Sequence, residues 1–172
     1  EDPEEMKTLL TLATLTIMAG TGCNQNQDAY RVSSESSEAP PPDPRAEKMW
    51  GHDLTKAQTH AKGAGKLVLL DFTGSDWCPP CMALHDFVLT QTEFLDFAEK
   101  HLELVELDFP KSKSIDKELA ERNAKLAEKY NVDGFPTIIV LDTAGEMVHR
   151  DVGYSGKNAK AYTVALAKAL GR

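Results

Sequence analysis

Apolar residues in this chain gather in short runs that alternate with stretches of helical spacing, and the alternation begins at Trp50. The first run, LVLLDF at residues 67–72, is nearly continuous, which is typical of a strand buried on both faces. LELVELDF at residues 102–109 predicts a second strand. TIIVLD and MVHRDVG flank TAG, so we predict an antiparallel hairpin over residues 137–153 with Gly145 in its turn.

Apolar and small residues at helical spacing predict the elements between these strands. The first predicted helix lies within residues 52–66 and stops at Gly63 and Gly65. The others are two consecutive helices from Pro79 that are interrupted at residues 90–92, and single helices over 115–130 and 158–170. The order of strand, helix, strand, helix, hairpin and helix predicts an α/β fold with a central mixed sheet and helices on both faces.

Residues 1–23 have the pattern of an export signal rather than of a folded element. MKTLLTLATLTIMAGTGC places one Lys before about a dozen apolar residues, fewer than the roughly 20 that a membrane-spanning helix needs. The pattern resembles a bacterial lipoprotein signal, in which Cys23 becomes the lipidated first residue of the mature protein. The alternative is an ordinary signal peptide cut nearby. EDPEE, before the first Met, has the wrong charge for a signal and is interpreted as a remnant of expression or an artefact of numbering.

The following segment, residues 24–48, is polar and rich in Ser and Pro, and it predicts a disordered tether. We expect residues 49–172 to form one domain, because a chain of 172 residues with 41% hydrophobic content can bury one core. The net charge of -8 argues against nucleic acid as a partner, since phosphate binding needs a basic patch.

Cys78 and Cys81 have two residues between them, a spacing that suits haem attachment, a metal site, a structural disulfide or redox exchange. Haem attachment needs a His directly after the second cysteine, where Met82 stands. A zinc site needs four ligands, and His85 is the one residue that could join the pair locally. We expect His85 to be a surface histidine instead. A structural disulfide that closes so few residues would stabilise the fold little.

Redox exchange fits the position of the pair, between a predicted buried strand and a predicted helix. Cys78 would lie at the helix N-terminus, exposed, where unpaired backbone N–H groups and the helix dipole favour a thiolate. Cys81 would lie one turn inward, less exposed, within reach of a mixed disulfide formed at Cys78. Pro79 and Pro80 would occupy first-turn positions, where a missing N–H costs nothing and a fixed φ stiffens the loop.

LLDFTGSDWCPPC, GFPT and VGY together resemble the thioredoxin superfamily over residues 50–171, and FTGSDWC resembles its exported, DsbH-type disulfide reductases. The resemblance implies a thioredoxin-like fold with a redox-active disulfide, no other cofactor and no metal. It also implies that Cys78 is the attacking nucleophile and Cys81 the resolving thiol. Asp71 would manage the proton of Cys81, or else be an ordinary strand-end carboxylate. The implied substrate-binding residues are Trp77, Phe135, Pro136 as a cis-proline, and Gly153.

Two features depart from this family pattern. Residues 110–123, PKSKSIDKELAERN, are an insertion that either shapes partner choice or extends a helix. Asp76 places a negative charge near Cys78, which should oppose part of the thiolate stabilisation. Pro80, directly before the second cysteine, offers neither a hydrogen nor a charge. These features predict a reduction potential nearer about -270 mV than about -120 mV.

The leading hypothesis is a thiol-disulfide oxidoreductase that reduces protein disulfides after export to the periplasm or cell envelope. We expect a lipid anchor at Cys23, with no other membrane contact. The expected partners are protein disulfide substrates and an upstream membrane or soluble thiol reductant, and the protein is expected to be a monomer. The alternatives are a disulfide isomerase or oxidase, and a redox-inert binding module or metal chaperone.

Overall fold

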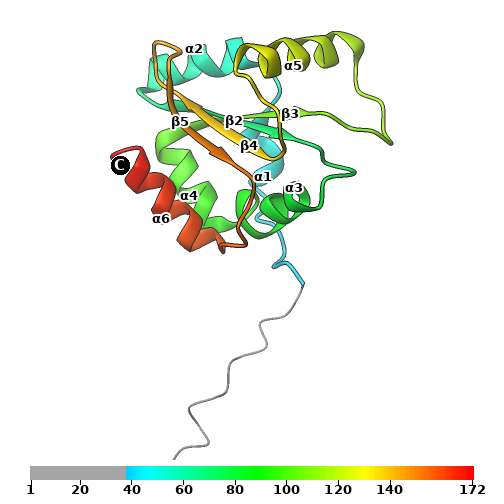
Figure 1. The fold of residues 1–172 in the computed structure, drawn as a ribbon. Helices are drawn as coiled ribbons and strands as arrows, with labels where there is room; N and C mark the ends of the chain where they lie inside the picture. Colours follow the sequence, from blue (N-terminus) through cyan, green and yellow to red (C-terminus); the bar gives the residue numbers. More distant parts are fainter. Residues whose placement is uncertain (1–37) are drawn as a thin grey trace, which may run out of the picture. The chain divides into compact units, whose positions relative to one another are not determined.

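The computed structural model describes residues 38–172, which form a five-stranded mixed sheet with helices on both faces (Figure 1). The strands are β1 (Trp50–Gly51), β2 (Leu67–Thr73), β3 (Leu102–Asp108), β4 (Thr137–Leu141) and β5 (Met147–Val152). Their order in the sheet is β1-β3-β2-β4-β5. Strands β1 and β2 run parallel to β3, whereas β4 runs antiparallel to both β2 and β5. The predicted α/β fold with a mixed sheet is confirmed.

Two layers of helices cover this sheet. The helices are α1 (Ala46–Met49), α2 (Leu54–Ala64), α3 (Pro79–Leu84), α4 (Thr92–His101), α5 (Lys117–Lys129) and α6 (Ala159–Ala169), and η2 (His85–Leu89) is a π-helical turn between α3 and α4. Figure 1 shows α2 and α5 on one face of the sheet and α3, α4 and α6 on the other. The predicted interruption between two consecutive helices is confirmed, because α4 begins at Thr92.

The central strand β2 is buried along its whole length. Leu67 and Leu69 pack in the core cluster that includes residues of α4 and α6, whereas Val68 and Leu70 pack in the cluster that includes residues of α2. This alternation follows from the two-residue repeat of a strand. Asp71 therefore lies on the face of the sheet that α3, α4 and α6 cover.

The structure tests the predicted end of the first helix and the predicted hairpin. Helix α2 passes through Gly63, so the predicted stop there is wrong; an exposed glycine inside a helix costs only about 1 kcal/mol. The helix ends instead at Gly65, whose φ of 66° forms a left-handed cap. The predicted hairpin is confirmed, since β4 pairs with β5 and Gly145 in the turn has a φ of 86°.

Residues 43–48 are ordered, although they fall within the segment predicted to be a disordered tether. The Asp43 N–H donates to the carbonyl of Thr90 at 2.8 Å. Arg45 binds the Asp43 carboxylate at 2.7 Å and the Asp96 carboxylate of α4, also at 2.7 Å. Ala46 is also buried in the core cluster. The polar contacts of Asp43 and Arg45 leave no trace in the hydrophobic pattern from which the tether was predicted.

The predicted export signal and Cys23 lie outside the described residues. Among residues 38–172, no helix combines the length and the apolar character needed to cross a membrane. The boundaries of the signal and of the tether therefore remain predictions, apart from the ordered residues 43–48.

Candidate active site

Cys78 and Cys81 form a disulfide where the loop after β2 meets α3. Their Cα atoms are 5.3 Å apart. Cys78 is the N-cap residue of α3, and Pro79 and Pro80 occupy the first two positions of the helix. The predicted position of the pair, between a buried strand and the start of a helix, is confirmed.

The first turn of α3 leaves few N–H groups for a Cys78 thiolate, so the prediction of unpaired donors there is wrong. Pro79 and Pro80 have no N–H to offer. The N–H groups of Cys81 and Met82 donate to the Cys78 carbonyl at 3.0 and 3.1 Å. The dipole of a six-residue helix remains, but direct amide donors in this turn are already used. Stabilisation of the thiolate is therefore weaker than at an open helix end.

Both cysteines are buried in the disulfide form. Cys78 is 4% exposed and Cys81 is 2% exposed, so the prediction of an exposed Cys78 is wrong for the oxidised pair. The Cys78 N–H donates to the Gly74 carbonyl at 3.0 Å, which holds the preceding turn against the cysteine. Pro79 and Pro80 are exposed directly beside the pair. A partner can therefore approach the disulfide from the side of the two prolines.

Asp71 is a buried carboxyl group, 4% exposed, and its Oδ1 atom has no hydrogen-bond partner. Burial raises the pKa of Asp71 to about 8, and the charges of Glu106 and Asp108 add to the increase. Glu106 is the direct neighbour of Asp71 in the register of β2 and β3. A carboxyl group with a pKa near neutrality can both accept and release a proton during catalysis.

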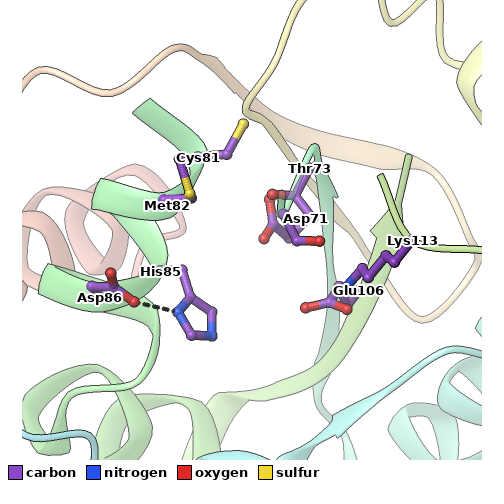
Figure 2. A pocket seen from close by; sticks show the side chains of 9 residues that line it. Asp71, Thr73, Cys81, Met82, His85, Asp86, Glu106 and Lys113 are labelled. Atoms are coloured by element: carbon purple, nitrogen blue, oxygen red, sulfur yellow. Dashed lines mark hydrogen bonds and ion pairs between the residues drawn. The ribbon is translucent and has the colours of Figure 1, made fainter. Parts of the chain in front are cut away.

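Asp71 and Cys81 line the same cavity, which has a volume of about 380 Å³ (Figure 2). The other lining residues are Thr73, Ser75, Met82, His85, Asp86, Glu106 and Lys113. Figure 2 shows Cys81 extending from α3 toward the strand that carries Asp71. The side chains of His85 and Asp86 are 51% and 53% exposed, so the cavity opens to solvent. Asp71 and Cys81 lie at the buried side of this cavity, 4% and 2% exposed.

Of the remaining polar residues of this cavity, His85 was predicted correctly, whereas Glu106 and Lys113 were not predicted. His85 is exposed, as expected, and its Nδ1 atom lies 2.8 Å from the Asp86 carboxylate. Glu106 was not predicted as part of the site, although its alternation with Leu104 along β3 places it on the α3 face. Lys113 lies in the loop between β3 and α5, and the hydrophobic pattern of the sequence does not predict the path of this loop. Over residues 38–172, no group of three or more His, Cys, Asp or Glu side chains is arranged to hold a metal ion.

Trp77 belongs to an aromatic group directly before the disulfide. Its indole N–H donates to the Phe109 carbonyl at 2.7 Å, and its ring meets Phe135 edge-on with centroids 5.8 Å apart. The rings of Phe109 and Phe135 are 5.2 Å apart. Gly74 leaves the space that the indole needs, since a Cβ atom there would lie 2.6 Å from the Trp77 ring. The position of Trp77 is thus fixed by both hydrogen bonding and packing.

The Phe135–Pro136 peptide bond is cis, as the resemblance implies. Pro136 is buried, and its carbonyl accepts the Gly153 N–H at 2.8 Å. Gly153 follows β5 with a φ of 81°, a conformation that favours glycine. The contact between Phe135 and Trp77 connects this cis-proline loop to the cysteine loop. Contact of these residues with a substrate peptide remains a prediction.

Asp76 anchors the loop after β3 to the cysteine loop. Its carboxylate accepts bonds from three consecutive backbone N–H groups, those of Lys111, Ser112 and Lys113, at 2.9, 2.6 and 3.0 Å. These bonds, led by the one from Lys111, hold the pKa of Asp76 below its usual value. We predicted only that this charge opposes the Cys78 thiolate. The structure adds that the N–H groups of the insertion already compensate much of it.

Comparisons with known proteins agree with this geometry. A family model described as a thioredoxin-like domain matches residues 54–169. The disulfide bond reductase DsbH of Chlamydia pneumoniae is 34% identical over 140 residues, which cover 81% of this chain and 83% of that protein. The solved structure of a DsbH oxidoreductase superposes with a TM-score of 0.67 at 32% identity, covering 79% of this chain and 94% of the other. A thioredoxin from Thermus thermophilus superposes with a TM-score of 0.52 at 22% identity, covering 71% of this chain and 85% of the other. At this identity the likeness supports the fold alone.

Proposed function

Since the chain belongs to the thioredoxin-like domain family and is a thiol-disulfide oxidoreductase, we propose that it reduces protein disulfides outside the cytoplasm. The observation that carries the proposal is the disulfide at the start of α3, beside Trp77 and with a buried Asp71 behind it. The relative DsbH is named a disulfide bond reductase, and its similarity extends over 81% of this chain.

In the proposed reaction the reduced pair gives two electrons to a substrate disulfide. The Cys78 thiolate bonds to one substrate sulfur, the substrate S–S bond breaks, and the second substrate sulfur leaves as a thiolate that takes up a proton. The Cys81 thiol then loses its proton and attacks the Cys78 sulfur, which releases the first substrate sulfur. The products are a substrate dithiol and the Cys78–Cys81 disulfide.

We propose that the deprotonated fraction of Asp71 accepts the Cys81 proton, because the two residues line one cavity. With a pKa raised to about 8, Asp71 is mostly protonated at pH 7 and a minor share is available as the carboxylate. An acid of that strength matches a proton transfer near neutral pH. Asp71→Asn should therefore slow release of the substrate from the mixed disulfide more than formation of the mixed disulfide. Rapid-quench measurement of both steps tests the role, and equal slowing would indicate a structural role instead.

We expect this protein to donate electrons to its substrates, because the fold stabilises the Cys78 thiolate poorly. Two prolines remove N–H donors from the first turn of α3, and the next two N–H groups bind the Cys78 carbonyl. Weak stabilisation of the thiolate makes the reduced form less stable and lowers the reduction potential. We expect a potential nearer about -270 mV, as in thioredoxin, than about -120 mV, as in the oxidant DsbA.

The cellular setting is proposed from the sequence and from the named relatives. Export through the signal in residues 1–23 and lipidation of Cys23 would hold the domain at a membrane without a spanning helix. Protein disulfides would be the substrates, and an upstream thiol reductant would restore the dithiol after each turnover. We propose that the protein acts as a monomer and needs no cofactor besides the cysteine pair.

Two measurements test the proposed function. Insulin reduction in the presence of dithiothreitol should be accelerated by the protein and not by Cys78→Ala; no acceleration would favour a redox-inert binding module or metal chaperone. Equilibration with glutathione gives the potential. A value above about -180 mV, the level of protein disulfide isomerase, would favour an isomerase or oxidase.

A further inference from the structure

The loop that opens the 110–123 insertion is fastened to the two residues before Cys78. Asp76 binds three of its backbone N–H groups, and the Trp77 indole binds the carbonyl of Phe109 at its start. Figure 1 shows this loop, between β3 and α5, projecting on the same side of the molecule as the loop that leads into α3. The loop that opens the insertion therefore lies directly beside the cysteine loop.

Two lysines of this loop differ in their electrostatic partners. The Lys113 ammonium lies 3.0 Å from the Asp108 carboxylate, so an acidic group already compensates its charge. The Lys111 ammonium lies 3.6 Å from the centroid of the Trp77 ring, and no carboxylate of residues 38–172 lies within ion-pair distance of it. Lys111 is exposed. The nearest carboxylate that the structure links to this residue is that of Asp76, which binds the Lys111 backbone N–H and not the ammonium. Lys111 therefore presents a positive charge without an ion-pair partner in residues 38–172, above the aromatic residue next to Cys78.

We propose that Lys111 is a specificity-determining residue, which favours substrates that carry Asp or Glu beside the disulfide cysteine. The inference rests on the proposed function, since a substrate cysteine must reach Cys78 next to Trp77. A substrate chain at that position passes the Lys111 ammonium, and a carboxylate in the chain can pair with it. Contact with the ring restricts the lysine side chain before binding, so less side-chain entropy is lost when the pair forms.

The expected preference is modest and local. An exposed ion pair contributes about 0.2–1 kcal/mol, which corresponds to about a 1.4- to 5-fold change in rate or affinity. The net charge of -8 repels acidic substrates at long range, so their absolute rates need not be high. The informative quantity is therefore the ratio of rates for two substrates that differ in one flanking charge, compared between variants of Lys111.

The test uses cyclic disulfide peptides that are identical except for Asp, Asn or Lys beside the cysteines. The kcat/KM for each peptide is measured with dithiothreitol as the reductant. Wild type should prefer the Asp peptide over the Asn peptide by about 1.4- to 5-fold more than Lys111→Gln does. Lys111→Glu should shift the preference further, toward the Lys peptide. The difference should disappear at about 1 M salt, where the Debye length is about 3 Å.

Lys168→Gln, which removes an equal charge from the last turn of α6, is the matched control and should leave the ratio unchanged. A general loss of folding or activity affects all peptides alike and does not move the ratio, so it cannot imitate the effect. Equal Asp-to-Asn ratios in wild type, Lys111→Gln and Lys111→Glu would overturn the inference while leaving the reductase intact. Failure of wild type to reduce even the Asn peptide would instead refute the proposed function, and this inference with it.

Discussion

Asp71→Asn should make the folded protein more stable at neutral pH, although it removes a carboxyl group from the active site. The unfolded chain carries Asp71 with an ordinary pKa of 3.8, whereas burial raises the pKa to about 8 in the folded protein. Folding at pH 7 must therefore protonate this group. Each pH unit between the unfolded pKa and the working pH costs about 1.4 kcal/mol, so about three units cost about 4 kcal/mol at most.

Asparagine is neutral in both states and avoids this cost. Part of the gain is offset, because the Asn amide brings two N–H donors where a protonated carboxyl has one O–H donor, and a buried donor without a partner costs about 1–3 kcal/mol. The net gain at pH 7 should be about 1–3 kcal/mol. Because the folded pKa is the higher one, wild type keeps the full stability of this group only below about pH 4 and loses it as the pH rises through about 8.

Urea unfolding of both proteins in their disulfide forms, followed by circular dichroism at pH 4, 7 and 9, measures this difference. The advantage of Asp71→Asn should be smallest at pH 4, grow to pH 7 and level off above pH 8. Asp53→Asn is the contrasting control, because the Lys56 N–H lowers the pKa of Asp53 and its removal should give no such gain. A variant that is less stable than wild type at pH 7, or a difference independent of pH, would refute a buried, protonated Asp71.

Three further predictions concern the cysteines and their surroundings. Gly74→Ala should destabilise the fold by about 1–3 kcal/mol and change the Trp77 fluorescence, since a Cβ atom would lie 2.6 Å from the indole ring. An unchanged unfolding curve and emission spectrum would contradict this packing. After reduction, alkylation at mildly acidic pH followed by peptide mapping should label Cys78 before Cys81, because Cys78 lies at the N-cap of α3 beside the exposed Pro79 and Pro80. Equal labelling would oppose the assigned roles. In the native host, Cys23→Ser should move the protein from the membrane to the soluble fraction, and an unchanged distribution would exclude the lipid anchor.

The hydrophobic pattern was a sufficient guide wherever an element is long and buried. Strand β2 is buried at all seven positions, and its continuous apolar run was recognised as a buried strand. Strand β1 has two residues and α1 has four, which is too short for any periodicity to appear. The attachment of the chain before α1 depends on Asp43 and Arg45, and such polar contacts leave no mark in that pattern.

The candidate site was predictable where residue type alone limits the chemistry. Two cysteines beside prolines, together with the family resemblance, indicated the redox pair, and the cis-proline was expected from GFPT. The hydrogen bonds between Asp76 and the insertion were not predictable, because they join segments 35 to 37 residues apart in the chain. The missing N–H groups of Pro79 and Pro80 could be read from the sequence, whereas the bonds from the Cys81 and Met82 N–H groups to the Cys78 carbonyl were missed.

Trapping of the mixed disulfide tests the central claim, that Cys78 attacks and Cys81 resolves, most directly. The single variants Cys81→Ser and Cys78→Ser are incubated with a cyclic disulfide peptide, quenched with acid and mapped by mass spectrometry. The Cys81→Ser variant should accumulate the peptide as a mixed disulfide on Cys78, because the thiol that would release it is absent. The Cys78→Ser variant should accumulate little or none, since Cys81 lies inside the first turn of α3 rather than at its N-cap. Equal adducts on both variants, or an adduct on Cys81 alone, would contradict the account.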